Sequence, residues 1–338
     1  MKNLLKLFIT YQLKDSKPHQ KPDGFTLIEL LVGLILAFLV ITPLLGFMIS
    51  IMTQDRQEQA KAASEQEIQS ALNYISRDVD QAVFIYDGKG LTQIADQLPT
   101  VPSGSPVLVF WKRKFLPKSL PIKGVGDCSD QTKCDDAFVY SLVAYYQITE
   151  NPCTNNNWSC TSRIGRVEIR DALPDVNNPS GGGNAPAVVP NQDKSPGFEL
   201  FNLAQPTASG LEEQMNNWKN SGTDIDKNQP EILIDYIDQS TVANLPPASC
   251  SIAPRDGVVP AVPYQFRKVP PTSTTSSFYA CVDTDKTIAQ VFIRGNALAR
   301  IRPKQNPPAY VPSQQAYFPK ASIQVQGRGL VQITPGSS

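Results

Sequence analysis

The strongest pattern in the chain is an apolar run near its amino terminus. Residues 25–53 read FTLIELLVGLILAFLVITPLLGFMISIMT and carry a single charge, on Glu29. At about 1.5 Å per residue, a helix of this length crosses the roughly 30 Å hydrocarbon core of a bilayer. The pattern predicts a membrane-spanning helix over residues 25–53.

A second helical pattern follows without a break. Apolar residues recur at steps of four and three, which places them on one face of a helix, at Ile68, Leu72, Ile75, Val79 and Ala82. The residues between them are polar. We therefore expect one helix from Phe25 to about Phe84, with an amphipathic section over 54–85 whose apolar face packs under a sheet.

Beyond Tyr86, short β-type runs alternate with clusters of Pro, Gly, Ser and Asn, a pattern typical of an antiparallel sheet with long loops. The candidate strands are 107–111, 138–148, 164–170, 231–237, 287–294 and 321–333. The run FVYSLVAYYQI at 138–148 lacks clean alternation and predicts a central strand covered on both faces. Residues 173–210 and 245–275 are proline-rich and predict surface loops. The expected class is α+β, one long helix on one sheet, with 86–338 as the head.

The segment before the apolar run is basic. Residues 1–24 contain five lysines and end in Gly24. The positive-inside rule places this leader in the cytoplasm and the head across the membrane, as a single-pass protein. A secretory signal would have a shorter apolar core with a cleavage site after it. A plain signal anchor is the alternative, but Glu29 then costs a few kcal/mol unless it is paired.

The string GFTLIELLVGL, from Gly24 to Leu34, resembles the prepilin cleavage motif of type IV pilins and type II secretion pseudopilins. In that family a membrane peptidase cuts after the glycine and methylates the new amino terminus. The resemblance implies a cut between Gly24 and Phe25, an N-methylated Phe25, and a role for Glu29 in subunit assembly. A freed amine on Phe25 can neutralise Glu29 of a neighbouring subunit in low dielectric.

A second resemblance covers residues 57–87. The segment QEQAKAASEQEIQSALNYISRDVDQAVFIYD looks like the corresponding stretch of the J-type minor pseudopilin of type II secretion, in which an arginine–acid pair, here Arg77-Asp78, precedes an apolar run. The length, the long leader and the cysteine-rich head are also similar to pseudopilins of the hormogonium polysaccharide secretion system of filamentous cyanobacteria.

These resemblances imply a structural minor pseudopilin in the inner (plasma) membrane, with its head in the periplasm. The prepilin peptidase would process it, and it would join other pilin-like subunits through its helix on an inner-membrane assembly platform. In a tip or priming position, it would support export of protein or polysaccharide by a periplasmic or surface filament. One alternative is a minor type IV pilin for adhesion, motility or DNA uptake, and another is a membrane-anchored hydrolase.

Composition argues against other functions. Lys plus Arg and Asp plus Glu each number 31, so the net charge is zero, which disfavours nucleic-acid binding. The single histidine, His19, lies in the leader, so a processed protein has no imidazole for catalysis. The sequence contains no G-x-S-x-G, Walker or H-E-x-x-H motif. We therefore expect no enzymatic activity and no cofactor.

All six cysteines lie in the exported head, where thiols meet an oxidising compartment. Their spacing suggests local disulfides, although six cysteines allow fifteen connectivities. The pairs are Cys128–Cys134, Cys153–Cys160 and Cys250–Cys281. A zinc site is disfavoured, because C-x5-C and C-x6-C spacings without histidine do not fit zinc-finger patterns.

Two further clusters have competing interpretations. Calcium could bind the aspartates around the first cysteine pair, but the D-x-D-x-D-G loop is absent and a solvated acidic loop is favoured. These aspartates are Asp127, Asp130, Asp135 and Asp136. The run Trp111-Lys112-Arg113-Lys114-Phe115 could contact polysaccharide or a partner, whereas we favour a charged strand end that deters sheet pairing.

Overall fold

The computed structural model describes residues 24–150, 153, 157–178, 187–203, 210–241, 245, 250, 266–272, 276–302 and 307–329. The chain divides into two compact units, Met1–Asp55 and Arg56–Ser338. Residues 1–23 of the expected leader, and parts of both proline-rich stretches, lie outside the described residues.

The long helix α2 runs over Leu27–Val79. It therefore ends earlier than the expected end near Phe84, because Ala82–Ile85 form strand β1 with all four residues buried. A short apolar run does not distinguish a buried strand from a buried helix by periodicity alone. The Val, Phe and Ile side chains of this run favour the strand. The expectation of a helical segment over 54–85 was thus wrong for its last residues.

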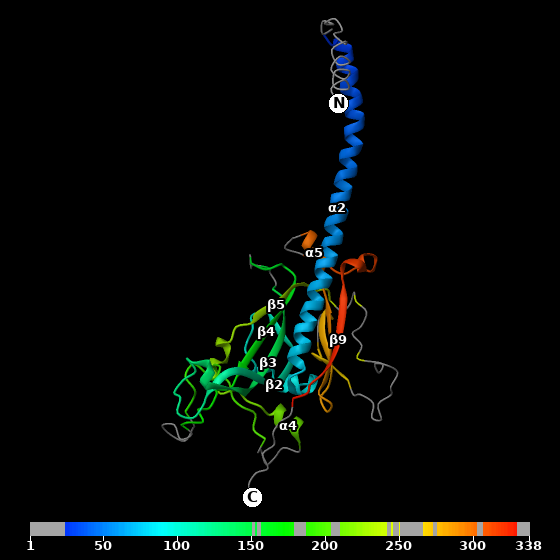
Figure 1. Ribbon diagram of the computed structural model, residues 1–338. Coiled ribbons are helices and arrows are strands. Elements are labelled where there is room, and N and C mark those ends of the chain that lie inside the picture. Colours follow the sequence, from blue (N-terminus) through cyan, green and yellow to red (C-terminus); the bar gives the residue numbers. More distant parts are fainter. Residues whose placement is uncertain are drawn as a thin grey trace, which may run out of the picture. The chain divides into compact units, whose positions relative to one another are not determined.

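The amphipathic part of α2 packs into the core as expected. Ile68, Leu72, Ile75 and Val79 are at most 1% exposed. They belong to one hydrophobic cluster that also contains residues from both sheets described below. Figure 1 shows this part of the helix in cyan, with β2–β5 on one side and β9 on the other. The helical stripe is therefore core, as its spacing predicts.

The first sheet has five antiparallel strands in the order β1-β2-β3-β4-β5. The remaining strands are β2 (Gly104–Pro121), β3 (Cys134–Ile148), β4 (Ser162–Arg170) and β5 (Glu231–Ile237). Strand β3 lies in the middle, and residues 141–148 are all buried. The incomplete alternation of this run is therefore explained by cover on both faces, as predicted.

A second, four-stranded antiparallel sheet corrects the expectation of a single sheet. Its order is β6-β7-β8-β9. The strands are β6 (Arg267–Val269), β7 (Phe278–Asp283), β8 (Ile288–Arg294) and β9 (Lys320–Gln326). Strand β6 falls inside the stretch expected to be loop, and β7 was not expected at all. The α+β class is nevertheless confirmed.

The two sheets and the helix meet around Gly295. This residue forms an isolated antiparallel bridge with Ile237 at the end of β5. A Cβ at Gly295 would lie 2.6 Å from Ser64 Oγ and 2.9 Å from Ile68 Cδ1 of the helix. Only a glycine permits this close approach of helix and strand end. Farther along, Arg328 N donates to Asp80 O at 2.9 Å and ties the chain after β9 to the end of α2.

Short helices complete the head. They are α3 (Gly88–Ile94), α4 (Leu211–Asn216) and α5 (Ala297–Ile301), with 3-10 turns η1 (Ala95–Gln97), η2 (Gln131–Lys133), η3 (Thr223–Lys227) and η6 (Pro312–Tyr317). Two of the α-helices have polar caps. Asp87 Oδ1 accepts from Gly90 N at 2.8 Å, and Asn296 Oδ1 accepts from Ala299 N at 3.1 Å. These caps satisfy backbone donors that a helix start otherwise leaves free.

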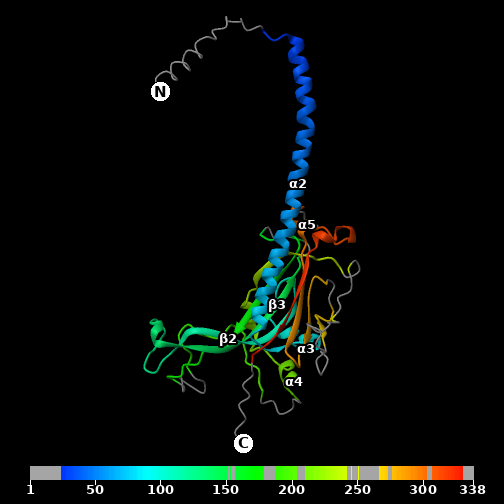
Figure 2. The ribbon, with the colours of Figure 1, turned by 45° about the vertical axis from the view of Figure 1, so that its right-hand side comes forward.

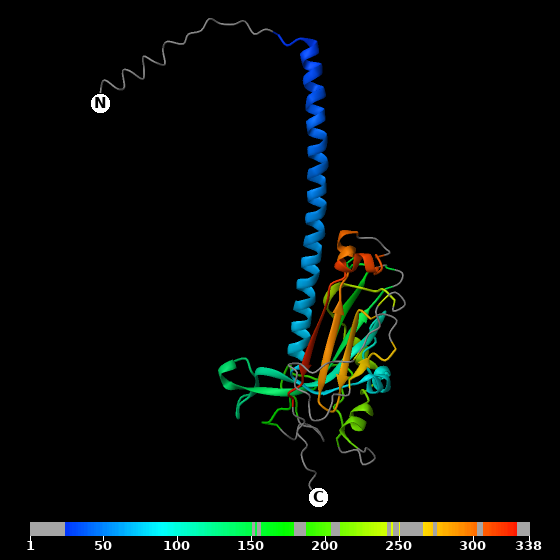
Figure 3. The same cartoon turned by 90° about the vertical axis from the view of Figure 1, so that its right-hand side faces the viewer.

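Strands β2 and β3 extend past the rest of the sheet as a two-stranded ribbon, which projects sideways in Figures 2 and 3. One face of the ribbon has its own small core, in which Leu116 and Val139 pack with Leu173 and Val189. The ribbon is therefore held by a loop from the 173–210 stretch rather than by a neighbouring strand.

Candidate functional site

The expected assembly site lies at the start of α2. Thr26 precedes the first helical residue, and its N and Oγ1 donate to Glu29 Oε2 at 3.2 and 2.9 Å. Glu29 N donates in turn to Thr26 Oγ1 at 3.4 Å. This reciprocal arrangement is a capping box, in which a Thr and a Glu three residues later satisfy donors at a helix start. In a single chain, Glu29 therefore has a local role.

The apolar run presents a largely apolar surface to its surroundings, with Glu29 as its one charge. Every residue from 24 to 56 is exposed in the isolated chain. Its threonine hydroxyls bond to carbonyls one turn back, Thr42 to Phe38 O and Thr53 to Ile49 O, both at 2.8 Å. The described residues thus include one helix that is long and apolar enough to span a membrane.

The fold of the chain does not explain Gly24. A Cβ at this position would meet nothing within 4 Å, in contrast to Gly295, where it would collide with the helix. Phe25 is 87% exposed. Neither residue of the expected cleavage site is required by packing within the described chain.

At the other end of α2, a buried ionic network fixes the helix to the first sheet. Asp78 in the last helical turn is 6% exposed, and it accepts a hydrogen bond from Lys112 Nζ of β2. Arg166 Nε of β4 and Tyr145 OH of β3 both donate to Asp78 Oδ2 at 2.8 Å. Arg166 Nη2 also donates to Glu168 at 2.7 Å. One helical carboxylate therefore binds three adjacent strands.

The ionic network shifts the pKa values of Glu168 and Tyr145. Burial raises the pKa of the Glu168 carboxyl, but the charges of Lys112 and Arg166 and a hydrogen bond from Arg166 outweigh burial and lower that pKa to about 2. Burial raises the pKa of the Tyr145 phenol, and the charge of Asp78 raises it further. At neutral pH, Glu168 is therefore ionised and Tyr145 is a neutral donor.

Two residues of the run 111–115 are structural. Trp111 is fully buried, and its Nε1 donates to Tyr86 OH at 3.0 Å. Lys112 belongs to the ionic network. Both lie on β2, which pairs with β1 on one side and β3 on the other. The interpretation as a charged strand end that deters pairing was therefore wrong for these two residues, because both are paired with a strand on each side.

The rest of this run lies on the ribbon. Phe115 and Phe138 face each other with ring centroids 5.2 Å apart, and they are 47% and 53% exposed. Arg113 lies 4.8 Å from the centre of the Phe138 ring. Lys114 Nζ pairs with Glu168 Oε1 at 3.3 Å. The run is therefore divided between the core, the ionic network and an exposed aromatic pair.

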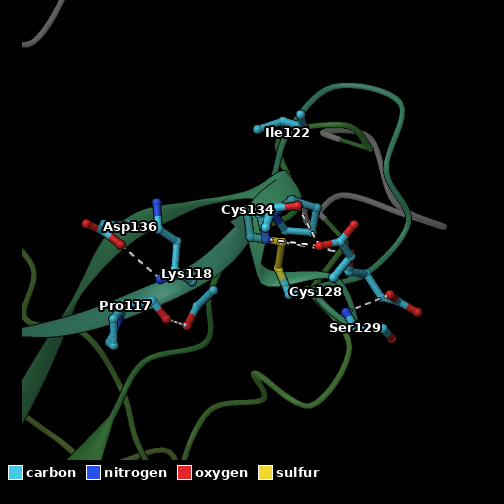
Figure 4. The surroundings of a disulfide bond; sticks show 12 residues. Pro117, Lys118, Ile122, Cys128, Ser129, Cys134 and Asp136 are labelled. Atoms are coloured by element: carbon cyan, nitrogen blue, oxygen red, sulfur yellow. Dashed lines mark hydrogen bonds between the residues drawn. A yellow bond between two sulfur atoms is a disulfide. The ribbon is translucent and has the colours of Figure 1, made fainter.

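The head has three disulfides, and they join the expected pairs: Cys128–Cys134, Cys153–Cys160 and Cys250–Cys281. The first closes the tip of the ribbon, as Figure 4 shows. Next to it, Lys118 N donates to Asp136 Oδ1 at 2.9 Å across the ribbon. The pairing predicted from sequence locality is confirmed.

The aspartates at this tip are engaged in local turns. Asp127 Oδ1 accepts from Ser129 N at 3.0 Å, and Asp130 Oδ1 accepts from Thr132 N at 3.1 Å. Each of these bonds, together with the hydroxyl of the same Ser or Thr, lowers the pKa of its aspartate. Across the described part of the chain, no three His, Cys, Asp or Glu side chains are grouped so that they could hold a metal ion.

Sequence reasoning missed two kinds of residue. Thr26 escaped notice, although the T-x-x-E spacing from Thr26 to Glu29 is a capping-box signal. The partners of Asp78 also escaped notice, because Lys112 and Arg166 lie 34 and 88 residues away in sequence. No local pattern marks that contact.

Comparisons of the chain with protein-family models, curated proteins and solved structures find no match. The geometry of the chain, an apolar amino-terminal helix packed on antiparallel sheets, is a pilin-like layout.

Proposed function

We propose that the chain is a minor, pilin-like subunit that is processed at Gly24 and joins a filament through its apolar helix. The observation that carries this proposal is the exposed apolar surface of residues 25–53, interrupted by one carboxylate four residues after Phe25. A helix that only anchors the chain in a membrane needs no charged residue at position 29. A subunit that pairs with the amino terminus of its neighbour needs a carboxylate there.

For Glu29, an ion pair with the amine of a neighbouring subunit is more favourable in the membrane than its hydrogen bonds with Thr26. In the single chain, the carboxylate has only hydroxyl and amide donors from Thr26. A charged carboxylate in hydrocarbon is costly, and a positive amine from a cut neighbour lowers that cost far more than a neutral donor does. Subunits would therefore align with the amino terminus of one beside Glu29 of the next.

The size of the head supports a position at the filament tip. It contains two sheets, and its ribbon projects beyond the first sheet (Figures 2 and 3). A head of this kind is easier to accommodate at the end of a filament than at every position along it. We propose that such a tip subunit primes a filament that supports export of protein or polysaccharide, as in type II secretion.

The decisive experiment separates the local role of Glu29 from its role between subunits. Glu29→Gln removes the charge, and Thr26→Ala removes the cap while the charge stays. We expect Glu29→Gln to abolish incorporation into filaments and Thr26→Ala to retain it, because an N-cap contributes only about 0.5–2 kcal/mol. Incorporation is measured by sedimentation and immunoblotting of sheared filaments from cells that express each variant.

Membrane levels of both variants serve as the control, since each must insert for the comparison to be valid. If Thr26→Ala and Glu29→Gln lose incorporation equally, Glu29 acts only as a cap and the pairing is refuted. Normal filament incorporation of Glu29→Gln would refute the assembly function itself.

A further inference from the structure

The head contains a cavity of about 620 Å³ at one end of the first sheet. This volume lies in the range of small-molecule sites, about 300–1,000 Å³. Its floor is a pair of strands: Ser105 lies opposite Gln147 in the β2–β3 register, and Thr149 N donates to Ser103 O at 2.9 Å. Ser103 and Thr149 directly flank the two strands, and all four polar residues line the cavity.

Three other segments form the walls. Helix α3 and turn η1 contribute Leu91 and Ala95, and the chain after β5 contributes Gln239 and Thr241. The third wall is formed after β6 by Pro270, Pro271 and Thr272. Pro106 and Val107 of β2 complete the lining.

The chemistry of this lining is uniform. Among the described residues around the cavity, none carries a charge, while five bear hydroxyl groups and two bear carboxamides. The rest are Leu, Val, Ala and Pro. Hydroxyls and carboxamides both donate and accept hydrogen bonds. Such a lining suits an uncharged ligand that offers many hydroxyls and some C–H surface, and it offers no counter-charge to a phosphate or carboxylate.

Two local features point to a use for the cavity beyond packing. Ser103 has φ 57°, a left-handed conformation that normally favours glycine, although glycine follows directly at position 104. A side chain at such a strained position costs stability and is often tied to function. Gln239 Oε1 is buried and has no hydrogen-bond partner among the described residues. This acceptor has almost no accessible surface, and a buried acceptor in this state costs about 1–3 kcal/mol. A ligand in the cavity relieves that cost if the Gln239 carboxamide turns towards it.

Two of the walls, helix α3 and the segment after β6, are held together within the chain itself. Asp87, which caps α3, also accepts from Arg267 Nη1 of β6 at 2.9 Å. A Cβ at Gly88 would lie 2.9 Å from Lys268 O and 3.3 Å from Pro271 Cβ, so α3 packs directly on the wall after β6. A preformed site loses less entropy when it binds a ligand.

We propose that this cavity binds a neutral saccharide unit, with the hydroxyls of Ser103, Ser105 and Thr241 and the amide of Gln239 as its hydrogen-bond partners. This inference goes beyond the proposed filament function and does not depend on it. Binding is measured on the isolated subunit, whereas the filament function is measured by incorporation.

The test uses the full chain in phosphocholine nanodiscs and isothermal titration calorimetry. The neutral probes are maltotetraose, cellotetraose and the tetramer of N-acetylglucosamine, and the charged probe is tetragalacturonate. We expect at least one neutral probe to bind, and to bind at least ten-fold more tightly than the charged probe, a difference of about 1.4 kcal/mol.

Two variants locate the binding. Ser105→Trp fills the cavity and Gln239→Leu removes the unpaired acceptor, and each is expected to weaken binding at least ten-fold. Ser313→Trp, at an exposed serine outside the lining, is the matched control and should bind as the wild type does. Folding of each variant is checked by near-ultraviolet circular dichroism.

Three results would overturn the proposal. They are no binding of any neutral probe, equal binding by folded Ser105→Trp and the wild type, and tighter binding of a neutral Gly-Ser peptide than of every saccharide. The last result would assign the cavity to a peptide.

Discussion

Asp78 occupies a position that the electrostatics of a helix disfavours. It lies one residue before the end of α2, where the partial charge of the helix terminus is negative and basic side chains are preferred. It is also buried, which adds the cost of removing a carboxylate from water. The two cations of β2 and β4 offset both costs.

Replacement of the Asp78 carboxylate should therefore strongly destabilise the head. Asp78→Asn leaves the buried cations Lys112 and Arg166 without their main counter-charge. We expect the free energy of unfolding to fall by about 3–5 kcal/mol, as is typical when one partner of a buried pair is removed. Guanidinium unfolding of the full chain in micelles, followed by tryptophan fluorescence, measures this.

A neighbouring acid gives the matched control. Asp80 pairs with Arg328 at 3.2 Å, but the two side chains are 47% and 81% exposed. Exposed pairs contribute about 0–1 kcal/mol, so Asp80→Asn should change stability little. An equal loss in both variants would show that burial of the network is not the source of its stability.

Single residues were predictable only where a local spacing marks them. The cysteine spacing is local, and the three pairs that it indicated are present in the structure. The G-F-x-x-x-E spacing is also local, and the role it indicates for Gly24, Phe25 and Glu29 stays a prediction. The exposed acidic tip was also apparent from its composition. In contrast, the burial of Lys112 depends on the carboxylates of Asp78 and Glu168, which reach it only through the fold.

At the scale of elements, long and strongly patterned segments were predictable. The strand over Glu231–Ile237 has the predicted bounds, and β3, β4 and β8 differ from prediction by a few residues at one end. Two strand lengths were wrong: β2 is much longer than the predicted 107–111, and β9 ends at Gln326, before the predicted end at 333. Other failures were short or interrupted runs. Strand β6 has three residues followed by two prolines, so its pairing with β7 is visible only in the folded chain.

The disulfides should contribute unequally to stability. Cys250–Cys281 closes a loop with a sequence separation of 31 residues, whereas Cys128–Cys134 spans 6. The chain-entropy estimate gives about 3–4 kcal/mol for the long loop and about 2 kcal/mol for the short one. The double substitution Cys250→Ala/Cys281→Ala should therefore lower the unfolding midpoint more than Cys128→Ala/Cys134→Ala does in guanidinium titrations.

The opposite order would have a structural meaning. It would show that the ribbon tip, rather than the second sheet, limits the stability of the head. Because Cys281 is fully buried on β7 and Cys128 is only half-buried, we expect the chain-entropy order to hold.

At the scale of the whole chain, the prediction of one helix on one sheet captured the class but not the architecture. The sheets and the helix meet at single residues such as Gly295, and a single residue gives no periodic signal in the sequence. The strands of the second sheet are separated by loops of differing length. Periodicity identifies strands, but it does not assign them to sheets.

The ionic network should make the head sensitive to acid. The pKa of Glu168 is lowered from 4.5 to about 2 in the folded chain. A lowered carboxyl pKa stabilises the fold fully above the unfolded value, and this contribution is lost as the pH falls from about 4.5 towards 2. Unfolding free energies measured between pH 7 and pH 2.5 should fall less steeply below pH 4.5 for Glu168→Gln than for the wild type. Identical acid dependence in both proteins would contradict the role of Glu168.

The burial of Ile68, Leu72 and Ile75 in the same core as both sheets has a practical consequence for producing a water-soluble fragment. A fragment that begins after Val79 would lack the buried apolar face of α2 at the centre of the head. The guanidinium of Arg166 would then have lost its partner Asp78. A fragment that begins at Arg56, the first residue of the second compact unit, keeps this helix face and omits the apolar run that is long enough to span a membrane. We expect the longer fragment to purify as monodisperse material and the shorter one to precipitate.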